Sequence, residues 1–117
     1  MPPQMRILCV DAHKDACELI AAILEDCQVI SAHTKAEALH LATSEKLDLF
    51  IIGDRLPDGT GLEICLFIRT FNQQTPIIFA TFERMPRLQL ENLGAQGLVM
   101  KGPNFFDNLC AAVSNVN

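Results

Sequence analysis

The sequence predicts an α/β fold, a doubly wound five-stranded parallel sheet with helices on both faces. Two observations lead to this prediction. Short apolar runs alternate with segments in which apolar residues recur at helical spacing. Residues 47–52 are apolar at both odd and even positions apart from Asp48. This pattern is typical of a strand covered by helices on both sides. Right-handed crossovers would join such strands into one sheet, and residues 1–117 have the length of a single domain.

Each expected element follows from a local pattern. We expect strands at residues 6–10, 28–32, 47–52, 76–81 and 97–101. We expect helices at residues 15–27, 34–45, 60–71, 86–93 and 104–116. Three helices begin with an oxygen-bearing side chain followed three positions later by Glu, which is typical of a capping box. These pairs are Asp15 with Glu18, Thr34 with Glu37, and Thr60 with Glu63. Gly94 is placed to end the fourth helix.

The composition excludes several classes of protein. The net charge is −5 and no basic stripe is present, so we expect no direct binding to nucleic acid. No apolar run approaches the roughly 18 residues of a membrane span, so we expect no membrane insertion. The 5 cysteines include no CxxC pair and lie in apolar segments. We therefore expect reduced core thiols in a cytoplasmic protein.

Polar side chains follow three of the expected strands at the point where each strand ends. Asp11 follows the first strand, Thr81 ends the fourth and Lys101 ends the fifth. Ligands of parallel sheets bind beyond the carboxyl ends of the strands. A carboxylate, a hydroxyl and an ammonium group at one sheet edge suit a phosphoryl group, with the carboxylate holding Mg²⁺.

Five segments together resemble a bacterial response-regulator receiver domain over essentially the whole chain. They are ILCVD at residues 7–11, DLFII at 48–52, LPDGTGLE at 56–63, PIIFAT at 76–81 and GAQGLVMK at 94–101. The resemblance implies a flavodoxin-like (βα)5 fold and a role in two-component, or phosphorelay, signal transduction. It also implies that an aspartate at the end of the third strand normally accepts a phosphoryl group from a histidine kinase.

The acceptor position is the first departure from the family. In the family the acceptor lies four residues before the proline that matches Pro57, and that position is Gly53, which has no carboxylate. Asp54 is an acid displaced by one place. Because successive strand side chains point to opposite faces, we expect Asp54 to point away from the pocket unless a bulge turns it back.

The metal ligands are the second departure. The family usually has two adjacent acids after the first strand, whereas here Asp11 is followed by Ala12. The pocket charge falls from near −2 to near zero, and Asp11 and Lys101 can neutralise each other. We therefore expect weak Mg²⁺ binding at Asp11 or none, and no other cofactor.

The switch residues are the third departure. Thr81 keeps the family's hydroxyl, but the aromatic switch position is Leu98. Phe82 replaces a small residue and is expected to roof the pocket. Gly102 separates Lys101 from the proline that usually follows it in a cis bond, so the cis bond either moves to Gly102–Pro103 or is absent.

These departures favour an atypical receiver domain that is not an enzyme and acts by protein–protein interaction without aspartyl phosphorylation. The expected partner is a histidine kinase or a downstream effector. Met85, Leu88 and Leu90 are hard to bury together, which indicates an exposed apolar patch. In the family the fourth helix, last strand and last helix form the usual dimer or effector face, so the resemblance implies that this patch binds a partner or a second copy of the chain. The main alternative is a phosphorylatable receiver that uses Asp54 through a bulged strand end. A small flavodoxin-like enzyme or nucleotide binder is the third option, and neither GxGxxG nor a P-loop motif supports it.

Overall fold

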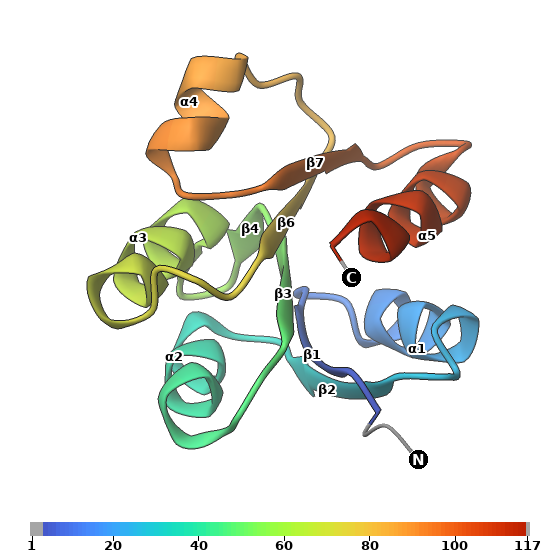
Figure 1. The fold of residues 1–117 in the computed structure, drawn as a ribbon, viewed down its shortest axis with the longest axis horizontal. Helices are drawn as coiled ribbons and strands as arrows, with labels where there is room; N and C mark the ends of the chain where they lie inside the picture. The colour runs from blue at the N-terminus through green and yellow to red at the C-terminus, as the bar shows by residue number, and fades with distance from the viewer. Residues whose placement is uncertain (1–3, 117) are drawn as a thin grey trace.

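The computed structural model describes residues 4–116, which form a central parallel sheet between two layers of helices (Figure 1). Five strands lie in the order β2-β1-β3-β6-β7, and every adjacent pair is parallel. Their bounds are β1 Arg6–Val10, β2 Gln28–Ala32, β3 Leu49–Gly53, β6 Ile77–Thr81 and β7 Gly97–Met100. The predicted doubly wound, five-stranded α/β fold is confirmed, and each strand begins within two residues of its expected position.

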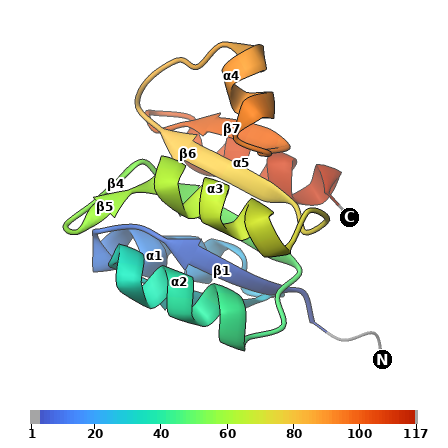
Figure 2. The ribbon, with the colours of Figure 1, turned by 90° about the vertical axis from the view of Figure 1, so that its left-hand side faces the viewer.

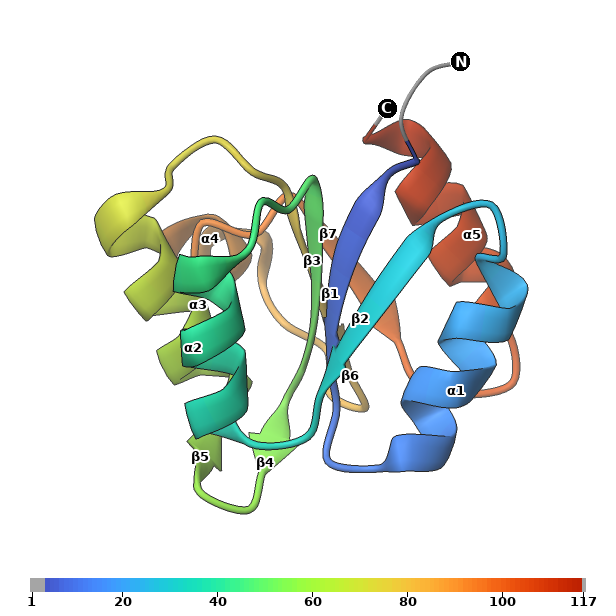
Figure 3. The ribbon, with the colours of Figure 1, turned by 90° about the horizontal axis from the view of Figure 1, so that it is seen from below.

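The helices divide between the two faces of the sheet. They are α1 Lys14–Ile23, α2 Lys35–Ser44, α3 Gly61–Phe71, α4 Arg87–Asn92 and α5 Phe105–Asn115. Figure 3 shows α1 and α5 on one face, with α2, α3 and α4 on the other. The first strand enters the middle of the sheet and the order reverses beside it, so the switch point lies between β1 and β3.

Alternate residues of the strands pack into two separate cores, one on each face of the sheet. All of β3 is buried: Phe50 and Ile52 pack into the core under α2 and α3, whereas Leu49 and Ile51 pack into the core under α1 and α5. Each large aliphatic or aromatic side chain buried in this way stabilises the fold by about 1.5–3 kcal/mol. Because both faces of β3 are covered by helices, none of its side chains meets water.

The helix starts only partly follow their sequence signals. At α3 the Thr60 hydroxyl accepts from Glu63 N while Glu63 accepts from Thr60 N, so the predicted capping box is complete. Thr34 caps α2 in the predicted position. The predicted Asp15–Glu18 box is wrong, because α1 begins one residue earlier with His13 at its N-cap and no side-chain cap. Gly94 adopts φ 73° and closes α4, as predicted.

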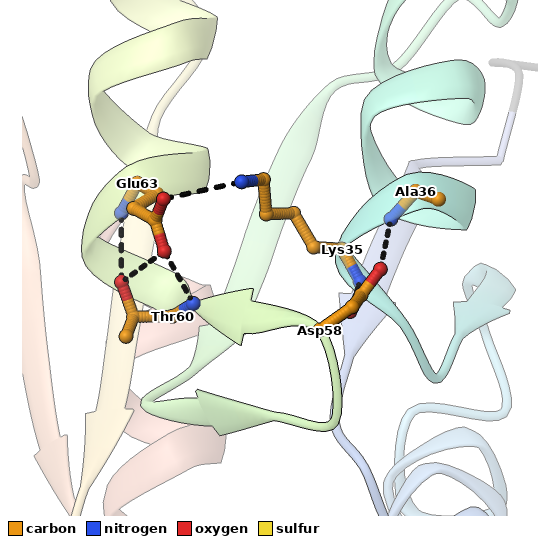
Figure 4. Close-up of polar contacts among 5 residues, drawn as sticks. All are labelled: Lys35, Ala36, Asp58, Thr60 and Glu63. Carbon is orange, nitrogen blue, oxygen red and sulfur yellow. Dashed lines mark hydrogen bonds and ion pairs between the residues drawn. The ribbon is translucent and has the colours of Figure 1, made fainter.

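A short hairpin follows β3 and was not predicted. It joins β4 Arg55–Leu56 to β5 Gly59–Thr60, and Figure 2 shows it projecting beside the N-terminal start of α3. Its turn residue Asp58 reaches the start of α2, where its carboxylate accepts from Lys35 N at 2.6 Å and Ala36 N at 3.0 Å (Figure 4). These backbone hydrogen bonds lower the pKa of Asp58, Lys35 first and then Ala36. The hairpin therefore ties the segment after β3 to α2.

Candidate functional site

The carboxyl ends of β1, β3, β6 and β7 meet at one edge of the sheet. Asp11 directly follows β1, Gly53 is the last residue of β3, Thr81 is the last residue of β6, and Lys101 directly follows β7. The register pairs Gly53 with Ala80 and Thr81 with Met100, so the strands end level with one another. The topology thus brings together the side chains singled out from the sequence.

Asp11 and Lys101 form an ion pair at the centre of this edge. Lys101 Nζ lies 2.8 Å from Asp11 Oδ2, and the other carboxylate oxygen accepts from His13 N at 2.9 Å. Asp11 is only 4% exposed, so it meets little water. Both oxygens of the carboxylate are therefore engaged by groups of the chain itself, which is the neutral pairing that the charge count predicted.

Gly53 lies close to the backbone at the end of β1. A Cβ atom built on Gly53 would lie 2.9 Å from the carbonyl oxygen of Val10 and 3.3 Å from Asp11 Oδ2. The first distance is shorter than carbon and oxygen atoms tolerate without movement, and the contact is with backbone rather than with a flexible side chain. Residue 53 thus has no carboxylate, and a side chain there would fit only if the backbone shifted.

Asp54 does not point away from the site, so that prediction is wrong. Its Oδ2 accepts a hydrogen bond from the hydroxyl of Thr81 at 3.0 Å, and Thr81 in turn accepts from Glu83 N at 3.1 Å. The strand alternation on which the prediction rested does not apply, because β3 ends at Gly53 and the chain bends at Asp54 before the hairpin. The carboxylate is half-buried and borders a cavity of about 350 Å³ together with Asp11 and Lys101.

The residues present do not fit a Mg²⁺ ion in the way that the family resemblance implies. Ala12 supplies no oxygen ligand, both oxygens of Asp11 are engaged, and Asp54 is held by Thr81. Within residues 4–116 no group of three or more His, Cys, Asp or Glu side chains is arranged to hold a metal. Since Mg²⁺ needs several oxygen ligands and loses its waters reluctantly, these side chains do not form a magnesium site.

Phe82 and Arg55 flank the site. The Phe82 ring stands over the Lys101 ammonium group, 5.5 Å from ring centroid to Nζ, while 74% of the residue stays exposed. It covers the lysine from one side, as the expected roof, without closing the site. Arg55 lies on the surface and pairs with Glu83 at 3.8 Å, so it does not hold Asp54.

Two further positions differ from the family, Leu98 and the peptide bond before Pro103. Leu98, at the expected aromatic position, is half-buried and packs against the core under α2, α3 and α4. The peptide bond between Gly102 and Pro103 is trans, as are the other described ones. Neither position therefore shows the aromatic or cis feature that the family usually has.

Sequence reasoning missed a thiol–imidazole cluster beside Asp11. His33 Nδ1 lies 3.0 Å from the carbonyl oxygen of Asp11 and 3.9 Å from Cys17 Sγ, so its ring contacts both groups. A side-chain hydrogen bond with Cys9 is the main cause that lowers the pKa of Cys17 below that of an ordinary thiol. Only the position of His33 directly after a strand signalled this contact. All five cysteines are free, as predicted, and Cys27 and Cys110 are only half-buried.

The apolar residues near α4 behave differently from one another. Leu88 is 69% exposed, whereas Met85 and Leu90 are half-buried and pack against the core. The expected patch is therefore centred on one exposed leucine.

Comparisons with known proteins place this geometry in a family. The family described as "Response regulator receiver domain" matches residues 7–114. The response regulator protein PilR of Pseudomonas aeruginosa is 34% identical over 80 residues, which cover 67% of this chain but 18% of PilR. This chain thus spans less than a fifth of that relative.

Solved structures agree with this assignment over the whole fold. A two-component response regulator from Clostridium difficile is 29% identical with a TM-score of 0.86, over 97% of this chain and 95% of that chain. The response regulator protein TrrA from Thermotoga maritima, in complex with Mg(2+)-BeF, is 30% identical with a TM-score of 0.87, over 97% and 100%. The chemotaxis response regulator CheY4 of Vibrio cholerae is 26% identical with a TM-score of 0.89, over 98% and 100%.

Receiver domains of this kind interact with kinases and effectors in two-component systems. No helix among residues 4–116 has both the length and the apolar character that crossing a bilayer requires. Because the family match spans nearly the whole chain and the sheet has the same flavodoxin-like order, the chain belongs to the response regulator receiver domain family of two-component signalling.

Proposed function

We propose that this receiver domain works without aspartyl phosphorylation and without enzymatic activity, as a protein-interaction module in two-component signalling. The observation that carries the proposal is the closed position at Gly53, where a side chain would meet the carbonyl oxygen of Val10 at 2.9 Å. An acyl phosphate needs a carboxylate, which Gly53 does not have, and a side chain in its place would force the backbone to move.

The charge balance of the site supports the same conclusion. Lys101 pairs with Asp11 at 2.8 Å, which leaves no excess negative charge for a divalent cation to offset. Phosphoryl transfer relies on positioning and on cations that neutralise the developing charge. A site without a fitting Mg²⁺ ligand set lacks most of that assistance, so we propose that Mg²⁺ binds weakly or not at all.

Output would then pass through docking rather than through a phosphorylation switch. The partner we propose is a histidine kinase or a downstream effector, bound by a surface that does not need a change at Leu98. The exposed Leu88 on α4 supports a contact on the α4–β7–α5 face, either with such a partner or with a second copy of the chain. We propose that this happens in the cytoplasm, and nothing in the acidic surface favours nucleic acid.

One observation keeps a phosphorylatable receiver as the second candidate. Asp54 presents a carboxylate to the same edge, bonded to Thr81 at 3.0 Å. Among the described residues, however, the ion pair of Lys101 is with Asp11, and none joins it to Asp54. Asp54 would therefore have to leave Thr81, and Lys101 would have to leave Asp11, before a phosphoryl group met both.

The test is incubation with ³²P-labelled acetyl phosphate and Mg²⁺, beside a phosphorylatable receiver domain as positive control. The proposal predicts no label that is stable in acid and labile in base, which is the signature of an acyl phosphate. Label of that kind on this chain would overturn the proposal. The Asp54→Asn variant then separates the candidates, because loss of the label would assign it to Asp54.

A further inference from the structure

A second cavity lies next to the ion pair and shares Asp11, His13, Phe82 and Lys101 with the first. It has a volume of about 400 Å³ and is lined by residues of α1 and α5. Figure 3 shows that these two helices cover the same face of the sheet. Cavities that hold small molecules in proteins are typically about 300–1,000 Å³, mostly apolar, with a few polar groups at one end. This cavity has that size and that arrangement.

Small side chains create the cavity. Cys9 and Ala80 form its floor and are 0% and 3% exposed, while Ala16 contributes a methyl group from α1. The walls are large apolar side chains, Ile20 from α1 and Phe105 from α5. Because the floor residues are short and the wall residues are long, the two helices do not close over the sheet at this end.

Two large apolar side chains stand in water at the mouth. Phe82 is 74% exposed and Leu19 is 52% exposed, and both line the cavity. An apolar ligand that covered them would remove this surface from water, at a gain proportional to the area covered. The opening therefore favours a ligand that is long enough to reach from the cavity to Phe82 and Leu19, and that is apolar where it contacts them.

The polar end of the cavity sets the charge of the ligand. Asp11 and Lys101 line it as a closed ion pair at 2.8 Å, so the pair carries no net charge. An ammonium group has three N–H donors and Asp11 takes one, which leaves donors for a ligand acceptor. Among the described residues, His13 is the one other ionisable side chain at this end of the lining, and it lies on the exposed side, so a charged ligand would lose its hydration without a buried counter-charge.

We propose that this cavity binds an uncharged aromatic or alicyclic small molecule that carries one hydrogen-bond acceptor, with its rings between Ile20 and Phe105 and its acceptor at Lys101. Ligand binding at this site would be an input to the receiver domain. The proposal does not depend on whether Asp54 accepts a phosphoryl group, and its test contains no phosphodonor.

The experiment is a titration of the ¹⁵N-labelled full chain with 1-naphthol, followed by amide chemical shifts. We expect saturable shifts centred on Ala16, Leu19 and Gly102, with a Kd on the order of 1 mM or tighter. Naphthalene-1-sulfonate, which has the same rings and a negative charge, should bind at least about ten times more weakly. Absence of saturable binding, shifts centred elsewhere, or equal binding of the sulfonate would overturn the proposal.

Two variant pairs test the location. Ala16→Leu fills the cavity and should weaken binding at least about tenfold, whereas Ala22→Leu, on the exposed side of α1, should not. Leu19→Ala removes apolar contact area at the opening and should weaken binding about three- to tenfold. Ile23→Ala, on the same helix but outside the cavity lining, should leave the affinity unchanged. Since Leu19 is exposed, its replacement keeps the test valid even if Ala16→Leu fails to fold. Equal affinities within the Leu19 and Ile23 pair would contradict the assigned cavity.

Discussion

Restoring the missing carboxylate should damage this protein rather than repair it. In Gly53→Asp the new Cβ would lie 2.9 Å from Val10 O and 3.3 Å from Asp11 Oδ2. Crowding in a well-packed region costs about 1–3 kcal/mol. Two like charges about 4 Å apart repel by about 4 kcal/mol at the effective dielectric of a protein surface, and Lys101 offsets part of that.

The size of each contribution can be separated with a neutral variant of the same shape. Gly53→Asn meets the same crowding without the charge, so we expect it to lower the free energy of unfolding by about 1–2 kcal/mol. Gly53→Asp should lower it by about 2 kcal/mol more, because of repulsion from Asp11. Urea unfolding followed by circular dichroism measures both values, provided that the slope with denaturant is unchanged.

Magnesium distinguishes this explanation from a general loss of packing. A second carboxylate beside Asp11 creates a pair of oxygen ligands, so Mg²⁺ should stabilise Gly53→Asp while leaving Gly53→Asn and the unchanged chain almost unaffected. If Gly53→Asp were as stable as the unchanged chain in the absence of divalent cations, our account of a closed position would be wrong.

Three further predictions follow from individual contacts. Lys101→Met leaves the Asp11 carboxylate 4% exposed without its counter-charge, so we expect urea unfolding to show a loss of about 2–4 kcal/mol, and no loss would mean that the ion pair is not structural. Asp58 has a lowered pKa, so its contribution is present above the ordinary carboxyl pKa and disappears as the pH falls through the folded value. Asp58→Asn should therefore unfold more easily at pH 7 but equally easily in acid, and a thermal-unfolding difference that persists in acid would refute the capping role. Cys27 and Cys110 are half-buried, so Ellman's reagent should modify two thiols quickly and the other three only on unfolding, whereas five equal rates would contradict the core positions.

Most of the fold could be predicted because its signals are local and repeated. The double burial of residues such as Phe50 and Ile51 is visible in the sequence as an apolar run without alternation, and it fixed a parallel sheet between two layers. Thr60 and Glu63 predicted the start of α3, and they form the expected capping box. The hairpin after β3 gave no such signal, because it is held by the distant start of α2 through Asp58.

The site was predictable in its composition but not in its directions. The charge count implied the pairing of Asp11 with Lys101. Opposite charges at one edge of a sheet attract each other, and this attraction does not depend on the exact positions of the side chains. The direction of Asp54 depended on where β3 stops, and a period-2 pattern carries no information past the last residue of a strand. The contact of His33 with the Asp11 carbonyl group joins two loops that are 22 positions apart in sequence. Such a contact requires the three-dimensional arrangement of both loops.

The most direct test of the closed, self-neutralised site uses the group that TrrA of Thermotoga maritima holds in its structure, Mg(2+)-BeF. The ¹⁵N-labelled chain is titrated with Mg²⁺ and beryllofluoride while the amide resonances of Asp11, Asp54 and Thr81 are followed. We predict no saturable change at these residues at concentrations that saturate a phosphorylatable receiver. A new set of resonances centred on Asp54, removed by Asp54→Asn, would contradict the account.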